Sequence, residues 1–450
     1  LDAKECLRFA TMWAKVSDIP MEGFRAEGKK YIVPTVDDCF VLGKCTDDRS
    51  LGIMAVKTNK GDMTTPQLHY LVKLKNEEYP GSQVQELMYH KRISDAFNTF
   101  CYKTPCKEKY SSIVYIDGAN GIGAPKALLM NPLLGDNLNI TVFNHGPAHL
   151  NIDCGADYVK IAQKPPQIYN SDLKYFPGGK FISFDGDGDR VVYFYFDKNN
   201  KFHLLDGDKI GVLLVKLITD LLAKAHIKDL DIGFVQTAYA NGSSTRYVEN
   251  NLKIDCVCVP TGVKHLHHKA KSYNVGVYFE ANGHGTVLFD HTFHTVVKRV
   301  AEDADSSETQ VVAAEKLLVL PALINQAVGD AICDMLAVEA ALRHFDMTMS
   351  HWDGFYCDLP SRQLKVKVKD RNLIKTTDAE REVESPAALQ LAINQHVAKY
   401  SQARCFVRPS GTENVVRVYA EASTQEAADS LANDVAQSVR DILDSHGDAN

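Results

Sequence analysis

The sequence predicts an α/β protein of several domains, in which βαβ domains precede a smaller α+β domain. Three observations support this fold class. The chain of 450 residues is too long for one ordinary hydrophobic core and should divide into about three or four domains. From Ile113 onward, β-forming runs alternate with helix-like stretches, which is the pattern of parallel βαβ layers. The last hundred or so residues lack this regular alternation and look like a small separate unit.

Composition narrows the class of protein. Hydrophobic residues make up 45% of the chain and charged residues 24%, as in soluble globular proteins. The net charge of −7 gives no sign of nucleic-acid or bilayer binding, so anionic ligands would need local basic pockets. No apolar run is long enough to cross a bilayer, and no signal peptide opens the chain. The eleven cysteines are scattered without paired metal spacing, which indicates a reducing, cytoplasmic setting.

The elements can be predicted in order along the first half. Residues 1–108 show least pattern: an amphipathic helix at 5–16, a short strand at 40–42 and a helix after Thr64-Thr65-Pro66. Strands are then expected at 113–116 and 140–143. Asp206-Gly-Asp208 leads into a long apolar-periodic helix through Leu222, with an aspartate well placed at its start.

The second half continues the alternation and then changes. Strands are expected at 232–236, 256–259 and 275–279, with helices from Ser243 and from His265, and a helical run over 307–345 is interrupted at Pro321. In the last unit we expect strands at 363–368, 405–407 and 415–420, a helix at 386–400 and a final helix. Ser423 with Glu426 predicts a capping box for that final helix. Its buried stripe would consist of Leu431, Val435, Val439 and Leu443.

The most informative motif lies at residues 185–190. Asp185, Asp187 and Asp189 alternate with two glycines between strongly β-forming runs. Side chains at every second residue of an extended segment share one face, so the three carboxylates should converge, and the glycines let the backbone bend. Crowded negative charges favour a bound hard dication, and oxygen-only ligands favour Mg²⁺.

Other interpretations of this motif fit less well. An EF-hand loop needs Gly at its sixth position and Glu at its twelfth, where this chain has Arg190 and Phe196. A phosphatase loop of the D-x-D-x-[TV] kind needs Thr or Val where Asp189 stands. A solvated acidic turn is the remaining alternative, since Asp-Gly pairs are common in turns.

A second motif, at residues 407–417, offers a phosphate site. Ser410, Gly411 and Thr412 form a turn with successive backbone N–H groups and two hydroxyls, and Arg408 and Arg417 add guanidinium groups. Such a nest suits a phosphate dianion. An ordinary hairpin turn with surface arginines is an equally good interpretation of the Arg-Pro-Ser-Gly-Thr string alone.

Two further segments follow predicted strands. Thr261-Gly262-Val-Lys264-His265 opens a helix, where N–H groups and basic side chains favour anions, and His265 could act as general acid or base. A solvated helix face is the alternative.

Glu280 and Asn282 come at the end of a predicted strand and could bind vicinal sugar hydroxyls. A structural Asx-turn is the alternative here. Residues 118–123 do not match the G-x-G-x-x-G fingerprint, so a nucleotide cofactor is not expected.

Taken together, Asp-Gly-Asp-Gly-Asp-Arg, Glu-Ala-Asn-Gly-His-Gly and Arg-Pro-Ser-Gly-Thr-Glu, in that order, resemble the α-D-phosphohexomutases. Longer strings at 236–246, 261–268 and 378–381 narrow the resemblance to the members that act on N-acetylglucosamine phosphates. The resemblance is continuous from about Thr64 to Tyr419 and beyond. It implies a phosphohexomutase-like fold with four domains around a central cleft, the last of which swings over the bound sugar.

The resemblance also implies a function. It assigns the chain to the interconversion of N-acetylglucosamine 6-phosphate and 1-phosphate, on the route to UDP-N-acetylglucosamine. In the family a phosphoserine donates its phosphoryl group, a bisphosphate forms and reorients, and Mg²⁺ neutralises charge during the transfer.

Site residues follow from the resemblance one by one. Asp185, Asp187 and Asp189 would hold Mg²⁺. Lys264, His265 and Arg190 would be catalytic. Substrate-binding roles would fall to Thr261 and Gly262 near the sugar and its leaving oxygen, Glu280 and Asn282 on the sugar hydroxyls, and Arg408, Ser410, Gly411, Thr412 and Arg417 on the phosphate that is not reacting.

The implied domains are an incomplete first mutase domain at 1–108, a metal-binding α/β domain at 109–225, a sugar-binding α/β domain at 226–350 and a phosphate-binding α+β domain at 351–450.

One departure from the family pattern concerns the nucleophile. The family's Thr-Ala-Ser-His-Asn-Pro loop occurs nowhere in the 450 residues, and Val41–Asp47 looks like a degraded form of a string that follows it. Ser50 is the nearest hydroxyl but lacks the loop's setting. We therefore expect either a fragment or variant form, or loss of the nucleophile. The alternatives for function are an inactive sugar-phosphate-binding module and a mutase of another hexose phosphate.

Overall fold

The computed structural model describes residues 24–26, 29–37, 40–45, 52–55, 63–79, 84–169, 171–410 and 413–447, the first four ranges as backbone strands. These four are β1 (Phe24–Ala26), β2 (Lys29–Asp37), β3 (Phe40–Cys45) and β4 (Gly52–Ala55), which pair antiparallel in that order. The strand predicted at 40–42 lies within β3, whereas the helix predicted at 5–16 lies outside the described residues.

Two helices precede the first α/β sheet: α2 (Thr65–Glu77) and α3 (Glu86–Tyr102). The helix expected after Thr64-Thr65-Pro66 is confirmed as α2. Thr64 caps it, because its side chain accepts from the backbone N–H of Gln67 and the Gln67 side chain accepts from the backbone N–H of Thr64.

The first sheet has the order β6-β5-β7-β8-β9. Its strands are β5 (Ile113–Asp117), β6 (Asn139–Phe143), β7 (Phe181–Phe184), β8 (Val191–Phe196) and β9 (Phe202–Leu205). The prediction of parallel layers is correct for β6, β5 and β7 and wrong for β8 and β9, which run antiparallel to their neighbours. The reason is the short loop 185–190 between β7 and β8, since a parallel pair needs a long crossover.

The second sheet has the order β11-β10-β12-β13. Its strands are β10 (Ile232–Gln236), β11 (Asp255–Cys258), β12 (Val275–Phe279) and β13 (Gly285–Phe289). The predicted strands at 232–236 and 275–279 are confirmed. β13 was not predicted and pairs antiparallel with β12. The crossover helices are α8 (Gly242–Tyr247), which continues into the π-turn η3 (Val248–Leu252), and α9 (Val263–Ala270), which begins two residues before the expected start at His265.

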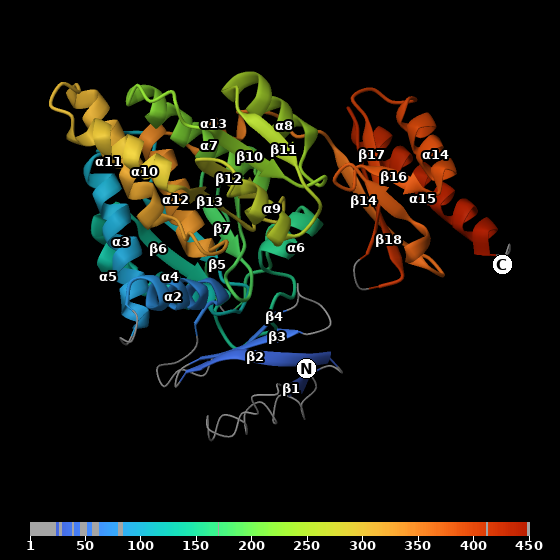
Figure 1. Ribbon diagram of the computed structural model, residues 1–450, viewed down its shortest axis with the longest axis horizontal. Helices are drawn as coiled ribbons and strands as arrows, with labels where there is room; N and C mark the ends of the chain where they lie inside the picture. The colour runs from blue at the N-terminus through green and yellow to red at the C-terminus, as the bar shows by residue number, and fades with distance from the viewer. Residues whose placement is uncertain are drawn as a thin grey trace.

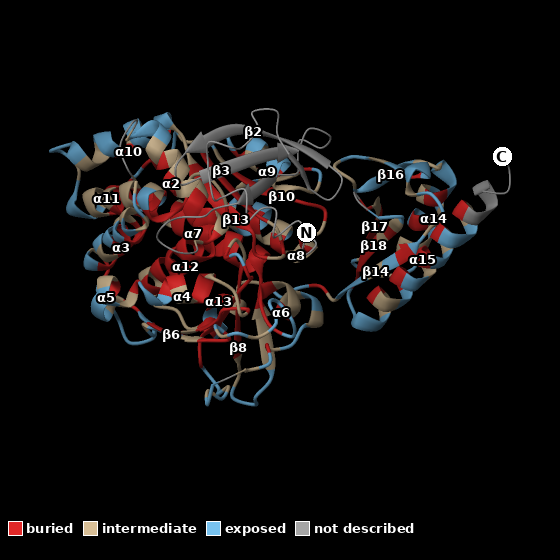
Figure 2. Cartoon of the chain, turned by 90° about the horizontal axis from the view of Figure 1, so that it is seen from below, coloured by how far each residue is buried: buried red, intermediate tan, exposed pale blue. Residues whose placement is uncertain are grey.

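Two buried helices connect the sheets. α7 (Gly207–Lys224) contacts β8 and β12, and α12 (Ala331–Phe345) contacts α7 and β8. Asp206 caps α7 as predicted, accepting from the N–H groups of Asp208 and Lys209. Figure 2 shows the buried residues concentrated along α7 and α12. One continuous apolar core therefore joins both sheets with α2 and α3.

Other helices cover the outside of this body. They are α4 (Gly123–Leu128), α5 (Asn131–Leu134), the 3₁₀ turn η2 (Gly135–Asn137), α6 (Ala156–Ala162), α10 (His291–Glu302), α11 (Glu308–Leu323) and α13 (Met349–Asp353). The prediction that the helical run over 307–345 is interrupted at Pro321 gives the wrong position for the break. Pro321 lies inside the last turn of α11, and the break falls at residues 324–330 before α12.

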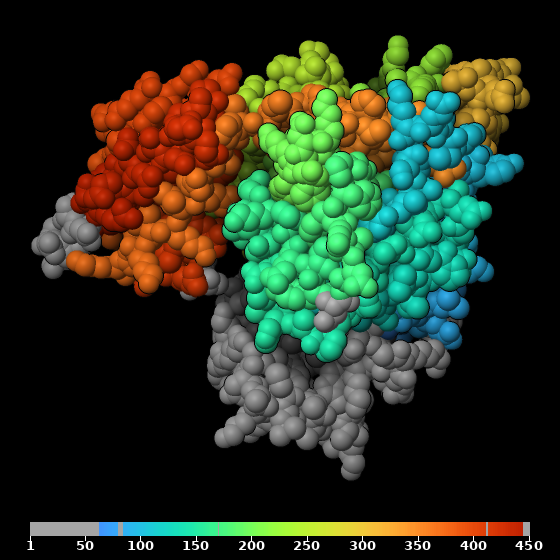
Figure 3. Space-filling view, turned by 180° about the vertical axis from the view of Figure 1, so that it is seen from behind, coloured from blue at the N-terminus to red at the C-terminus, as the bar shows by residue number. Residues whose placement is uncertain are grey.

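The C-terminal unit is a sheet of order β14-β18-β17 with a hairpin and two helices. Its elements are β14 (Ser361–Lys367), the 3₁₀ turn η4 (Arg371–Leu373), β15 (Lys375–Thr377), β16 (Glu382–Ser385), α14 (Ala387–Val397), β17 (Arg404–Pro409), β18 (Val415–Glu421) and α15 (Gln425–Gly447). It has its own apolar core. In Figures 1 and 3 this unit, orange to red, stands out from the rest of the molecule.

The final helix differs from the prediction at its start. The capping box of Ser423 with Glu426 is wrong, because the side chain of Thr424 accepts from the backbone N–H of Ala427 and the Ser423 N–H donates to the carbonyl of Ser401. The buried stripe is confirmed: Leu431, Val435, Val439 and Leu443 are all buried. Among the described residues, no helix is both long and apolar enough to span a bilayer.

Candidate active site

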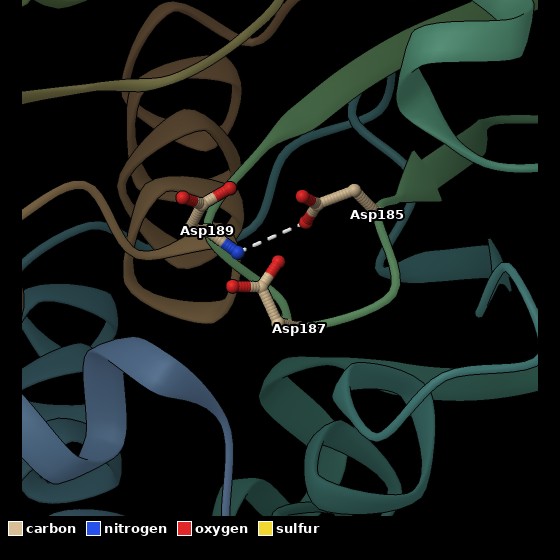
Figure 4. A group of neighbouring side chains, drawn as sticks. All are labelled: Asp185, Asp187 and Asp189. Atoms are coloured by element: carbon tan, nitrogen blue, oxygen red, sulfur yellow. Dashed lines mark hydrogen bonds between the residues drawn. The ribbon is translucent and has the colours of Figure 1, made fainter. Parts of the chain in front are cut away.

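The aspartate motif forms a tight loop between β7 and β8. One carboxylate oxygen from each of Asp185, Asp187 and Asp189 lies within 4.8 Å of the other two, and Figure 4 shows the three side chains around the loop. The predicted cause of this convergence is wrong, because the loop is a turn rather than an extended segment. Gly188 has φ of +77°, and Asp185 Oδ1 accepts from the backbone N–H of Asp189 at 2.9 Å.

Distant segments hold this loop in place. Backbone N–H groups donate to three successive loop carbonyls at 3.0–3.1 Å: Ile122 to Gly186, Thr65 to Asp187 and Ala331 to Gly188. The Thr65 hydroxyl also donates to Asp187 Oδ2 at 2.8 Å. The start of α2, the start of α12 and the loop before α4 therefore fix the position of the carboxylates.

The electrostatics of the loop are those of a cation site. Burial and the neighbouring carboxylates Asp189 and Asp187 raise the pKa of Asp185 to about 9. For Asp189, burial acts in the opposite direction, but hydrogen bonding and charge from His284 lower its pKa to about 2. Asp189 Oδ1 is buried and has no hydrogen-bond partner. An all-oxygen donor set with an orphaned carboxylate oxygen fits a hard dication such as Mg²⁺.

Arg190 lies beside this cluster and is itself paired. Its Nη1 donates to Asp157 Oδ2 at 2.5 Å, and its Nε lies 3.5 Å from Asp189 Oδ1. Burial lowers its pKa, but the charges of Asp157 and Asp189 outweigh that effect and raise it. The guanidinium thus partly offsets the negative charge of the loop.

The segment containing Glu280 and Asn282 joins β12 to β13 and lies against the aspartate loop at residues 185–190. The backbone N–H of Val191 donates to the carbonyl of Gly283 at 3.2 Å. Asn282 Oδ1 accepts from the backbone N–H of His284 at 3.1 Å, which is the Asx-turn that the sequence left as an alternative. Burial raises the pKa of Glu280. The structure therefore brings Glu280, Asn282 and the aspartate loop together.

The segment at residues 261–265 lies at the boundary with the C-terminal unit. Thr261 and Gly262 precede α9, and the side chains of Lys264 and His265 on its first turn are exposed. Gly262 has φ of +128°, in the region that favours glycine. The Thr261 hydroxyl and backbone N–H both donate to the Glu380 carboxylate, at 2.5 and 2.9 Å. This segment thus contacts a residue of the C-terminal unit.

Arg408 and Arg417 occupy one face of the C-terminal sheet. They pair across β17 and β18, in the same row as Lys365 on β14. Glu380 accepts from Arg408 Nε at 2.9 Å, and Arg417 Nε is buried without a partner. Ser410 is buried at the end of β17, whereas Gly411 and Thr412 lie outside the described residues. The row of basic residues Arg408, Arg417 and Lys365 thus lies close to Ser410 in the sheet, so that positive charge and a hydroxyl group are near each other.

Sequence reasoning missed three contact residues of this region: His284, Glu380 and Tyr239. His284 Nδ1 lies 3.3 Å from Asp189 Oδ2. The Tyr239 ring packs against Phe406 with the ring centroids 5.1 Å apart, and its buried hydroxyl interacts with the Arg408 guanidinium. Each lies inside one of the strings on which the family resemblance was based, but nothing in those strings shows which distant residue it contacts.

Comparison with known proteins gives three matching family models. They are phosphoacetylglucosamine mutase AMG1, domain II, over residues 80–192; phosphoacetylglucosamine mutase AMG1, domain III, over 206–347; and the phosphoglucomutase/phosphomannomutase C-terminal domain, over 364–438. The predicted division at 108, 225 and 350 stays a prediction.

Relatives match most of the chain. Phosphoacetylglucosamine mutase of Mus musculus is 48% identical over 412 residues, which are 91% of this chain and 73% of the relative. The protein of the same name from Homo sapiens is 47% identical, over 92% of this chain and 73% of its own. Among solved structures, Aspergillus fumigatus N-acetylphosphoglucosamine mutase in complex with GlcNAc-6P and magnesium is 45% identical, with a TM-score of 0.77 over 84% of this chain and 75% of that one.

Proposed function

The chain belongs to the phosphoacetylglucosamine mutase family, and on this premise we propose that it interconverts N-acetylglucosamine 6-phosphate and N-acetylglucosamine 1-phosphate in UDP-N-acetylglucosamine biosynthesis. The observation that carries the proposal is the 48% identity to a relative of that name over 412 residues. The carboxylate cluster beside the Glu280 segment supports it further.

Asp185, Asp187 and Asp189 would hold Mg²⁺. Their oxygens lie within 4.8 Å of one another, and the buried Asp189 Oδ1 has no hydrogen-bond partner. When bound, the ion would neutralise negative charge on the phosphoryl group in transfer. Arg190, next to Asp189, would add a fixed positive charge near the phosphoryl group. This charge would be its contribution to catalysis, the role that the family resemblance implies.

The sugar would lie between the two α/β sheets and the C-terminal unit. Glu280 and Asn282 would bind its hydroxyls, and Thr261 and Gly262 would line the leaving oxygen. Arg408, Ser410, Gly411, Thr412 and Arg417 would hold the phosphate that is not reacting, since guanidinium groups and backbone N–H groups suit a dianion.

The reaction itself requires one proton transfer for each phosphoryl transfer. A sugar hydroxyl gives up its proton as its oxygen bonds to the incoming phosphorus, and the donor oxygen takes up a proton when its own bond to phosphorus breaks. In the second transfer, the phosphoryl group that the substrate carried from the start moves from the bisphosphate to the donor. The two transfers therefore balance. His265 and Lys264 carry exposed titratable groups on the first turn of α9 and are our candidates for these protons.

The test uses the purified 450-residue chain with Mg²⁺, N-acetylglucosamine 6-phosphate and a trace of ³²P-labelled N-acetylglucosamine 1,6-bisphosphate. Formation of the 1-phosphate in ³¹P NMR, faster than with glucose 6-phosphate as substrate, would support the mutase. Because the family's serine loop is absent from these 450 residues, binding without turnover would instead support the inactive sugar-phosphate-binding module. Mass spectrometry of the protein then locates any transferred phosphoryl group. The Arg408→Ala variant serves as the impaired control. If calorimetry shows that the chain binds neither Mg²⁺ nor the sugar phosphate, the proposal fails.

We also infer a reducing compartment such as the cytoplasm. The eight cysteines whose side chains the structure describes are free thiols, and several are buried.

A further inference from the structure

A turn of unusual backbone conformation between β15 and β16 contains Glu380. Asp378, Ala379 and Glu380 have φ values of 49°, 55° and 69°, in the left-handed region that non-glycine residues rarely adopt. Arg381 supports the turn, because its backbone N–H donates to the carbonyl of Asp378 and its Nη2 donates to Asp378 Oδ1. Three such residues in succession are retained only where the surrounding contacts demand them.

The Glu380 carboxylate contacts residues of two different units. Oε1 accepts from Arg408 Nε at 2.9 Å, and the same Nε lies 2.9 Å from Oε2, within the C-terminal unit. Oε2 accepts from the backbone N–H of Thr261 at 2.9 Å and from its hydroxyl at 2.5 Å, on the segment before α9. Because the Glu380 and Arg408 side chains are each only 19% exposed, this ion pair is partly shielded from water.

The guanidinium of Arg408 also interacts with the Tyr239 hydroxyl, and its remaining N–H donors can face a phosphate. Glu380 engages the Nε side, and no other carboxylate among the described residues pairs with the two terminal nitrogens. A guanidinium binds a phosphate through two parallel N–H donors. A carboxylate on Nε can therefore fix the plane of the Arg408 guanidinium while its two terminal nitrogens, Nη1 and Nη2, donate to the anion. Thr261 donors and the arginine together offset the charge of Glu380.

We propose that Glu380 is a positioning residue for the phosphate site. It fixes the Arg408 guanidinium and joins it to Thr261. The distance between the phosphate-binding arginine and the segment beside the sugar is thereby kept constant. This inference rests on the function proposed above and adds to it a residue whose side chain acts through Arg408. A carboxylate that instead competed with phosphate for Arg408 would have the opposite effect on binding.

The test measures binding to the 450-residue chain by calorimetry in Mg²⁺, with N-acetylglucosamine 6-phosphate and, separately, inorganic phosphate. We expect Glu380→Gln to raise the Kd of the sugar phosphate about tenfold or more, because the isosteric amide loses the charge that holds Arg408. The Kd of inorganic phosphate should rise as well. Glu384→Gln, an exposed neighbour on β16, is the matched control and should change neither Kd.

A double-mutant cycle separates positioning from a general structural role. In an Arg408→Ala background, Glu380→Gln should raise the Kd less than twofold, since the group through which it acts is gone. An equal loss in both backgrounds would overturn the proposal, and so would unchanged or tighter binding by the single variant. Circular dichroism melting confirms that each variant is folded. If the unsubstituted chain binds inorganic phosphate but no sugar phosphate, the proposed function fails while the inorganic phosphate arm still decides the role of Glu380.

Discussion

Arg408 on β17 lies directly opposite Arg417 on β18 in the antiparallel C-terminal sheet. Like charges in this arrangement destabilise a sheet. Glu380 offsets one of the two guanidinium groups, but Arg417 Nε is buried and unpartnered. A bound phosphate would relieve the remaining repulsion, which gives the pair a functional explanation.

Replacing Arg408 with alanine should therefore weaken phosphate binding. We expect a loss of about 2–3 kcal/mol, or roughly 30- to 150-fold in Kd, as for a charge-assisted pair. Calorimetric titration of N-acetylglucosamine 6-phosphate measures it. The control is Arg362→Ala, which breaks an exposed ion pair with Asp429 on the same unit and should leave the affinity unchanged. A negligible change in the Arg408 variant would exclude this arginine from the site.

Asp187→Asn should reduce Mg²⁺ affinity without unfolding the chain. Asp187 is the exposed member of the aspartate cluster, and its removal relieves repulsion among the three carboxylates. We expect at least about a tenfold rise in the Kd for Mg²⁺, with a metal-free melting temperature equal to or above that of the parent. Isothermal calorimetry and thermal melting check both parts. Asp172→Asn, at an exposed aspartate outside the cluster, should change neither the Kd for Mg²⁺ nor the melting temperature. Unchanged Mg²⁺ binding by the Asp187 variant would remove the metal assignment.

Lys209→Met should loosen the segment that leads to the C-terminal unit. Lys209 is 2% exposed, and its Nζ donates to the carbonyls of Asp353 and Tyr356 at 2.8 and 2.5 Å. Losing these bonds leaves the carbonyls unpaired and should cost about 2–3 kcal/mol. Hydrogen exchange at residues 353–360 should quicken, whereas exposed Lys228→Met should have no effect there. Equal exchange in the two variants would contradict this role.

Leu431→Ala should destabilise the C-terminal unit on its own. Leu431 is fully buried in a core that shares no residue with the main core. The cavity should cost about 2–5 kcal/mol. Scanning calorimetry should show one transition moving to lower temperature and the transition of the larger body unchanged. A uniform shift of a single transition would mean that the two cores unfold together.

Stability should fall as the pH drops below neutrality, in part through His267. Burial, followed by the charges of Lys271 and Lys73, lowers the pKa of His267 to about 4, and its Nδ1 lies 3.1 Å from the Tyr278 hydroxyl. Because the unfolded chain takes up this proton near pH 6.5 and the folded chain only near pH 4, the contribution is complete above pH 6.5 and is lost between these values. Urea midpoints at pH 7.5 and 5 should differ less for His267→Gln than for the parent. An identical difference would exclude a contribution from this histidine.

Much of the fold followed from local patterns. The strands at 232–236 and 275–279, the Asp206 cap and the buried stripe of the final helix depend on residues that are neighbours in the chain, and the structure has them as expected. The antiparallel direction of β8 and the strand β13 were not foreseen, although a short connection between two paired strands requires that they run antiparallel. Similarly, both Ser423 and Thr424 can cap a helix, and the pairing of the Ser423 N–H with Ser401 decides between them.

The same distinction applies to the candidate site. By itself the sequence determined the family, the α/β class and the chemistry that each motif offers. Carboxylates separated by glycines can bind a cation, and arginines on either side of a Ser-Gly-Thr turn can bind an anion, because these properties belong to the residue types themselves. Only the tertiary structure decided that His284 contacts Asp189 and that Glu380 joins Arg408 to Thr261. These contacts join residues far apart in the chain, so they depend on how the sheets and helices pack, and no local spacing encodes that packing.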